Sequence, residues 1–124
     1  MYQYYNPNPY KKNVGDCIIR ALTKIFNRTW DDIGLEYFLF AFSEKDMPSS
    51  NIVLKKFLKQ YRYKKKLLPD ECPDCYNVNN FANNFGLGKY IVGTGSHIIA
   101  IIDGIIYDSW DSSNENIIYY FERE

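Results

Sequence analysis

The chain has 124 residues, of which 46% are hydrophobic and 18% aromatic, and this composition excludes an intrinsically disordered protein. Fifteen basic and fifteen acidic side chains give a formal net charge of zero, so overall charge favours neither nucleic acid nor a membrane surface as a partner. No apolar run approaches the roughly 20 residues that span a bilayer. Three cysteines, an odd number, are typical of reduced thiols, and we expect one cytoplasmic domain over residues 1–124.

Residues 1–12 are predicted to form an extended N-terminal arm. They are rich in tyrosine, and Pro7 and Pro9 exclude a helix here. We expect the tyrosines to pack the arm across the domain. Because the arm leads directly to Cys17, it is also a candidate for one lip of a substrate cleft.

A helix is predicted to follow the arm, with Gly15 and Asp16 as its turn and N-cap. Its apolar residues recur at the spacing of a buried stripe, at positions 18, 19, 21, 22, 25 and 26. Cys17 falls in the first turn, where unpaired N–H groups and the helix dipole stabilise a thiolate and lower the pKa of the thiol. Two roles remain open for Cys17: a nucleophile, or a small apolar residue on the inner face.

Two more helices are predicted in the first half of the chain. Thr29 and Asp32 resemble a capping box for a helix over about 30–42, and residues 48–50 begin another that ends near Gln60. The first of these is apolar nearly all round, so we expect a core helix. Its exposed part, within 38–42, is a candidate dimer or substrate face.

Basic residues gather between positions 55 and 66, with aromatic residues interleaved. This pattern is typical of surfaces that bind single-stranded nucleic acid or an acidic peptide. A solvated helix face that continues into a strand explains it better, since the aromatic residues also fit the core stripe and the net charge is zero. We therefore expect no nucleic-acid partner and no membrane partner, and the oligomeric state stays open.

Cys72 and Cys75 form a CxxC pair, which is typical of half a zinc site or of a redox couple. Zinc would need two more ligands, and the remaining candidates, Cys17 and His97, fit a different site. We interpret the pair as a loop whose thiols happen to be close, and we expect neither a metal nor a cofactor.

The second half of the chain predicts a short helix and a sheet. Val78 to Phe85 has helical spacing and is closed by Gly86. Strands are expected over 89–94 and 116–122, on either side of a hairpin. Two apolar runs flank Asp103-Gly104, which favours a two-residue type I′ turn.

The register of this hairpin brings chemically useful side chains together. Counting outward from the turn places His97 opposite Trp110 and puts both on one face with Asp108. Asp108 is the diagonal neighbour of His97, within ~7 Å between Cβ atoms, so its carboxylate can fix the imidazole tautomer. Asp103 lies in the remote turn and Asp111 on the opposite face. We expect Trp110 to cover the His–Asp pair and exclude water.

Cys17, His97 and Asp108 therefore supply a nucleophile, a base and an orienting acid. For the His–Asp pair alone, a half-buried histidine bonded to a carboxylate for stability is the better explanation. The cysteine at a helix start favours catalysis instead. Asn13 is the candidate side-chain donor to an oxyanion, beside the backbone N–H of Cys17.

The order of these residues, on a helix and then a hairpin, resembles that of papain-like cysteine peptidases. The segments Gly-Asp-Cys-Ile-Ile-Arg-Ala and Ser-His-Ile-Ile-Ala-Ile-Ile-Asp-Gly-Ile-Ile-Tyr-Asp-Ser-Trp-Asp are similar to those of small papain-like peptidases of Firmicutes and their phages. They are more distantly similar to the peptidases that process bacteriocin leaders. Where papain-like enzymes usually carry a glutamine, six residues before the cysteine, this chain has Lys11.

The resemblance implies an α+β papain-like fold, with N-terminal helices packed on a C-terminal antiparallel sheet. It also implies a cysteine peptidase, a hydrolase, or a related thiol acyl-transfer enzyme, acting on a peptide or isopeptide bond of a peptide or protein substrate. For a phage-encoded chain the location would be the host cytoplasm. The alternative is a catalytically idle papain-like protein that binds or inhibits a host factor or small ligand.

Overall fold

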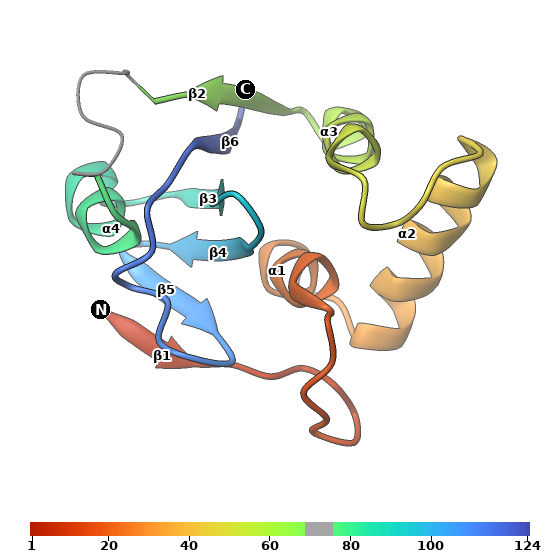
Figure 1. Cartoon of the computed structure of the whole chain (residues 1–124), viewed down its shortest axis with the longest axis horizontal. Helices are drawn as coiled ribbons and strands as arrows, with labels where there is room; N and C mark the ends of the chain where they lie inside the picture. Colours follow the sequence, from red (N-terminus) through yellow and green to blue (C-terminus); the bar gives the residue numbers. More distant parts are fainter. Residues whose placement is uncertain (69–75) are drawn as a thin grey trace.

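The computed structural model describes residues 1–68 and 76–124, which form an α+β fold (Figure 1). Its helices are α1 (Cys17–Phe26), α2 (Trp30–Ser43), α3 (Asn51–Gln60) and α4 (Val78–Phe85). Its strands are β1 (Tyr2–Tyr4), β2 (Tyr63–Leu67), β3 (Lys89–Gly93), β4 (Ile98–Ile102), β5 (Ile105–Asp108) and β6 (Tyr119–Arg123). Cys72 and Cys75, the expected loop thiols, lie outside the described residues. No described helix combines the length and the apolar character that a membrane span needs.

The strands form one sheet in the order β1-β5-β4-β3-β6-β2. All neighbouring pairs are antiparallel except β1 and β5, which run parallel. The expectation of a purely antiparallel sheet is therefore wrong at this edge. The arm adds itself to the free edge of β5, where the N–H of Tyr5 donates to the carbonyl oxygen of Asp108 at 2.7 Å. Pairing with an edge satisfies backbone groups that an isolated arm would leave to water.

The β4–β5 hairpin has the predicted register. Ile102 pairs with Ile105 and Ala100 with Tyr107, around a turn in which Asp103 and Gly104 have φ of 51° and 79°. Positive φ at both central residues defines the type I′ turn that matches strand twist. The ends of this hairpin, beyond the paired residues, carry His97 and Trp110.

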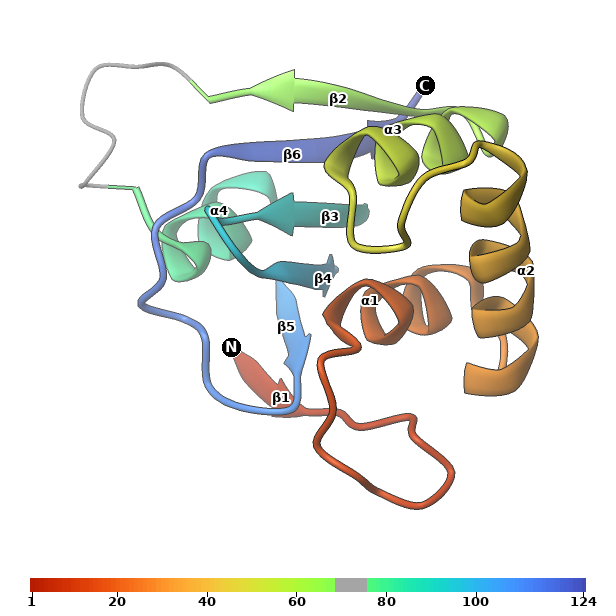
Figure 2. The same cartoon turned by 45° about the vertical axis from the view of Figure 1, so that its right-hand side comes forward.

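Helices cover both faces of the sheet, as Figures 1 and 2 show together. On one face Ile91 and Ala100 pack in the same core as α1, α2 and α3. On the other face Val92 and Ile99 pack with α4. Successive residues of a strand point to opposite faces, and central strands buried on both sides are apolar throughout. Of the three N-terminal helices, α1 packs on the sheet as expected and α3 contacts β2, whereas α2 packs mainly on α1 and α3. Helix α4 adds a layer on the other face.

Helix starts follow the sequence closely. The Thr29 hydroxyl accepts the N–H of Asp32 at 3.1 Å, as an N-cap of α2 should. The reciprocal half of the expected capping box is absent, because the carboxylate of Asp32 pairs with Arg28 at 2.7 Å instead. Ser50 caps α3, and Gly86 ends α4 with φ of 60°. Local capping chemistry therefore fixes where these helices begin and end.

Candidate active site

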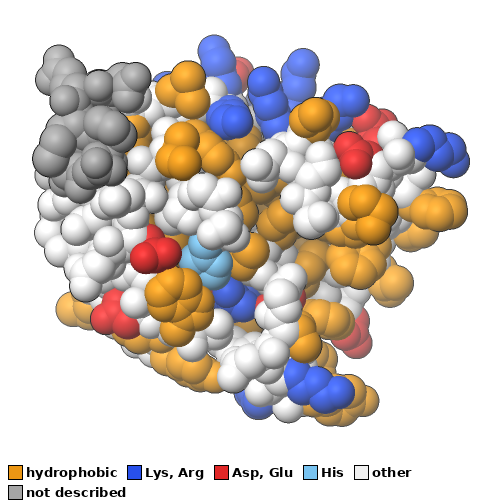
Figure 3. Space-filling view, in the orientation of Figure 1, with side chains coloured by type: hydrophobic (Ala, Val, Ile, Leu, Met, Phe, Trp, Pro, Cys, Tyr) orange, Lys and Arg blue, Asp and Glu red, His pale blue; other side chains and the backbone are white. Residues whose placement is uncertain are grey.

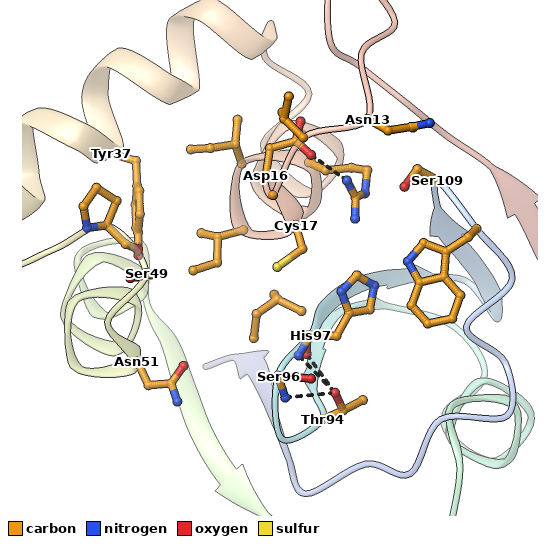
Figure 4. A pocket seen from close by; sticks show the side chains of 18 of the residues that line it. Asn13, Asp16, Cys17, Tyr37, Ser49, Asn51, Thr94, Ser96, His97 and Ser109 are labelled. Atoms are coloured by element: carbon orange, nitrogen blue, oxygen red, sulfur yellow. Dashed lines mark hydrogen bonds and ion pairs between the residues drawn. The ribbon is translucent and has the colours of Figure 1, made fainter.

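Cys17 is the first residue of α1, and its half-buried side chain lines a cleft between α1 and the sheet (Figure 4). Asp16 occupies the N-cap position but makes no side-chain cap. The expectation that Asp16 caps the helix is thus wrong for its carboxylate. One oxygen accepts from Arg20 at 2.7 Å and the other from Trp30 Nε1 at 2.9 Å. The first N–H groups of α1 therefore stay available at the cleft.

His97 lies at the corner between β3 and β4. Thr94 holds this corner: its Oγ1 accepts the N–H of His97 at 3.0 Å, and its own N–H donates to the carbonyl oxygen of His97 at 2.9 Å. The ring of His97 extends toward the Cys17 sulfur in Figure 4. Its Nε2 lies 2.6 Å from Asp108 Oδ2, which leaves Nδ1 as the ring nitrogen available to Cys17.

Asp108 ends β5 and is fully buried. Its carboxylate receives four different donors. Oδ2 faces His97 and accepts from Ser112 Oγ at 2.6 Å, and Oδ1 accepts from Arg20 Nη2 at 3.0 Å and from the N–H of Ser109 at 2.8 Å. A buried carboxylate is tolerated only with such full hydrogen bonding and a charge partner. The diagonal pairing predicted for His97 and Asp108 is therefore present, with the orientation that fixes the ring.

The electrostatics favour a charged Cys–His pair. Burial alone would raise the pKa of Cys17, but hydrogen bonds from His97 and the backbone of Ile98, with the nearby charges of His97 and Arg20, lower it below its ordinary value. Burial opposes the protonation of His97, and its hydrogen bonds with Asp108 and Cys17 outweigh burial and raise its pKa to about 9. The shifts have the directions that stabilise a thiolate beside an imidazolium near neutral pH.

Trp110 and Asn13 occupy different parts of the same cleft. The Trp110 ring lies 5.0 Å from the His97 ring between centroids and remains 45% exposed, so it covers one side of the imidazole. Together with its surroundings it leaves the His97 side chain only 12% exposed. Asn13 is exposed, and in Figure 4 its amide extends away from the Cys17 sulfur. Its role as an oxyanion donor stays a prediction that requires a rotation of the side chain.

The cleft has a volume of about 990 Å³. Beyond Cys17 it is lined by apolar and aromatic side chains, including Ile18, Phe38 and Tyr119. Apart from Cys17 and His97, the charged side chains of its lining are Asp16 and Arg20, which are buried and paired with each other. Figure 3 shows the single histidine at the surface beside hydrophobic side chains. The cleft therefore presents a largely apolar surface next to the thiol, and the charges of Asp16 and Arg20 in its lining offset each other.

Arg20, Thr94 and Ser112 were not identified as site residues from the sequence. A signal for Arg20 was present: it lies four residues after Asp16, inside the apolar stripe, where an unpaired charge would be costly. Thr94 and Ser112 gave none, because hydroxyl residues beside turns are common and only the folded chain shows what they contact.

Residues 1–68 and 76–124 contain no cluster of three or more His, Cys, Asp or Glu side chains arranged to hold a metal ion. Comparison with protein-family models, with curated proteins and with solved structures found no match to this chain. The geometry of the site is thus the basis for any statement about function.

Proposed function

We propose that this protein is a cysteine peptidase of papain-like type, or a related thiol acyl-transfer enzyme, that acts on a peptide or isopeptide bond. Cys17 is the nucleophile, His97 the general base and acid, and Asp108 the orienting acid. The observation that carries the proposal is the 2.6 Å contact between His97 Nε2 and Asp108, which directs Nδ1 toward a cysteine at a helix start. A buried histidine kept only for stability needs no such cysteine.

The reaction uses these groups in two steps. The Cys17 thiolate attacks the carbonyl carbon and forms a C–S bond; as the C–N bond breaks, His97 Nδ1 gives its proton to the leaving amine. Water then attacks the thioester while His97 takes its proton. The C–S bond breaks, the acid product leaves, and the Cys17–His97 pair is restored. With an amine in place of water, the same residues transfer the acyl group to that amine.

The oxyanion of each step needs donors close to Cys17. The backbone N–H of Cys17, at the positive end of α1, is the first donor, and the candidate second donor is Asn13. Asp108 steadies the imidazolium that forms when His97 is protonated. The balanced apolar lining of the cleft favours a substrate whose side chain next to the scissile carbonyl is uncharged and apolar.

A binding protein without turnover is the second candidate, and one observation favours it. Four large side chains on one face of α2 are 54% to 73% exposed: Leu35, Phe38, Leu39 and Phe42. They recur at the spacing of a single helix face, and such a face is typical of a protein-binding surface. Phe38 also lines the cleft, so this face and the candidate active site adjoin.

The test is the reactivity of Cys17 toward iodoacetamide between pH 4 and 10, measured by mass spectrometry of the intact protein. Cys72 and Cys75 are replaced by Ser so that Cys17 is the only thiol. An enzyme of this type has a Cys17 that reacts well below the free-thiol pKa of ~8.5 and that slows in His97→Ala. Cleavage of a peptide library, abolished in Cys17→Ser, then identifies the substrate. A Cys17 that reacts like an unfolded thiol, or is inert at every pH, contradicts the proposal and leaves the binding protein.

A further inference from the structure

Arg20 connects the two buried carboxylates of the site. It lies on α1, one turn after Asp16, and is only 5% exposed. Its Nη1 lies 2.7 Å from Asp16 Oδ1, and its Nη2 and Nε lie 3.0 and 3.1 Å from Asp108 Oδ1. Two N–H groups of the planar guanidinium thus converge on one oxygen of Asp108, and a third N–H bonds Asp16.

The two carboxylate oxygens of Asp108 accept from different partners, and this fixes the contact with His97. Arg20 occupies Oδ1 of Asp108, while His97 and Ser112 share Oδ2. Because both oxygens of the Asp108 carboxylate have donors, the group cannot rotate freely, and Oδ2 stays directed at His97 Nε2. Arg20 is itself fixed by its contact with Asp16, whose other carboxylate oxygen accepts a hydrogen bond from Trp30.

Stability alone is a weak reason for this arrangement. Replacing a buried set of ion pairs by apolar side chains of similar volume is often neutral or stabilising. Arg20 also lies between apolar neighbours, Ile19 and Ala21, on a helix that packs well on β4. An arginine at this position therefore suggests a function in the site that it contacts.

We propose that Arg20 is a positioning residue: it holds Asp108 against His97, and its positive charge sets the pH range in which Cys17 and His97 form an ion pair. This inference rests on the proposed function, in that it takes Cys17 and His97 as the reactive pair. Asp16 has the opposite effect, because it neutralises part of the charge of Arg20 at the start of α1. The two residues together tune the site in opposite directions.

The other titratable groups around the pair are uncharged near neutral pH or lie at the surface. Tyr2 of β1 donates its hydroxyl to the carbonyl oxygen of Asp108, and the pKa of its phenol is raised by burial and by Asp108. Tyr37 of α2 and Tyr119 of β6 face Cys17, and burial raises the pKa of both phenols. Asp111, after β5, is exposed. Substitutions of Arg20 and Asp16 therefore distinguish the effect of charge on the Cys17–His97 pair from the effect of lost side-chain packing.

The experiment measures the acidic midpoint of Cys17 alkylation by iodoacetamide, in the full chain with Cys72 and Cys75 replaced by Ser. In Arg20→Gln the midpoint rises by about 1 pH unit, because a nearby positive charge is lost. In Asp16→Asn it falls by about 0.5 unit, and the double variant lies between the two. Arg20→Lys keeps the charge but not all three N–H contacts, so its midpoint rises by less than about 0.5 unit, well below the rise in Arg20→Gln. Arg28→Gln is the matched control: it removes an arginine paired with Asp32 and Glu36, outside the cleft, and leaves the midpoint unchanged.

The failures of the two proposals are distinguishable. A wild-type Cys17 that reacts like an unfolded thiol, whatever stands at position 97, overturns the proposed function. A reactive wild-type Cys17 whose midpoint does not move in opposite directions in Arg20→Gln and Asp16→Asn overturns only the role of Arg20. A purely structural arginine would lower the melting temperature and leave the midpoint in place. If circular dichroism shows that Arg20→Gln does not fold, Asp16→Asn and Arg20→Lys decide. A fall of the midpoint in the first and a rise of less than about 0.5 unit in the second are expected only if the charge acts on Cys17.

Discussion

Replacing Asp108 by Asn tests the central contact of the site. Asn has the same shape but only one acceptor oxygen, whereas the carboxylate of Asp108 receives donors from His97, Ser112, Arg20 and the backbone of Ser109. If the amide oxygen faces Arg20, the NH₂ group faces His97 Nε2 and forces the proton onto Nδ1, the nitrogen that we propose accepts it from Cys17. If the amide is turned round, its NH₂ group meets the guanidinium, and two donors oppose each other.

Either orientation has a cost that the structure lets us estimate. Breaking a buried ion pair by removing one partner costs about 3–5 kcal/mol. Asn keeps some of the hydrogen bonds, so we expect the free energy of unfolding of Asp108→Asn to fall by about 3 kcal/mol. For a chain of this length this corresponds to a fall in the melting temperature of roughly 10 °C. With the wrong tautomer on His97, alkylation of Cys17 at pH 6 falls by about 100-fold, as expected for a thiol pKa higher by about two units.

Circular dichroism melting and iodoacetamide labelling at pH 6 measure these two effects on the same samples. Asp111→Asn is the matched control, because it changes an exposed carboxylate three residues away and leaves the Asp108 contacts intact. An Asp108→Asn variant as stable and as reactive as Asp111→Asn would falsify the orienting role of Asp108. A less stable variant with an unchanged Cys17 rate would keep Asp108 as a structural residue only.

Three further predictions concern the protonation of the pair, the cleft and the strand beneath it. In Cys17→Ala the part of the rise that comes from Asp108 still raises the pKa of His97, and no thiolate balances it. The free energy of unfolding is therefore highest below pH 6.5 and falls by about 1–2 kcal/mol as pH rises to 9, whereas the wild type changes little between pH 6.5 and 8.5; urea titrations measure this. Phe38→Asp slows the labelling of Cys17 by N-phenylmaleimide by about 10-fold and leaves iodoacetamide labelling unchanged. An unchanged rate with N-phenylmaleimide would mean that the apolar side of the cleft takes no part in binding. Gly93→Ala brings a Cβ within 2.2 Å of the Tyr119 ring and lowers the free energy of unfolding by about 2 kcal/mol in chemical denaturation; an unchanged midpoint would mean that the ring moves aside at no cost.

The sequence was sufficient to predict the hairpin and the residues at its ends. The type I′ turn at Asp103-Gly104 fixes the register, and register decides which side chains share a face. The meeting of His97, Asp108 and Trp110 therefore follows from local information and from counting. The start of α1 at Cys17 follows in the same way from helical spacing.

What could not be predicted depends on contacts between distant segments. The parallel pairing of β1 with β5 joins residues about a hundred positions apart, and no local pattern distinguishes a parallel from an antiparallel edge. The carboxylate of Asp16 turns away from the helix end because Arg20 and Trp30 compete for it, and this outcome is visible only once α1 and α2 are packed together. The placement of α4 behind the sheet likewise depends on the burial of both faces of β3 and β4.

Because the N-terminal arm contacts Asp108, we expect Cys17 to react fast only after the arm has docked. Asp108 is bonded through its backbone to Tyr5 and Tyr2 of the arm and through its carboxylate to Arg20 of α1. These partners are separated from it by up to 106 positions in the chain, so loops of that length must close before His97 is held in place. During refolding we expect the helices and the hairpin to form early, because their contacts are local, and a fast-reacting thiol to appear only when the last of these closures is complete. Short pulses of a thiol reagent, applied at increasing refolding times, would therefore measure when the final step of folding occurs.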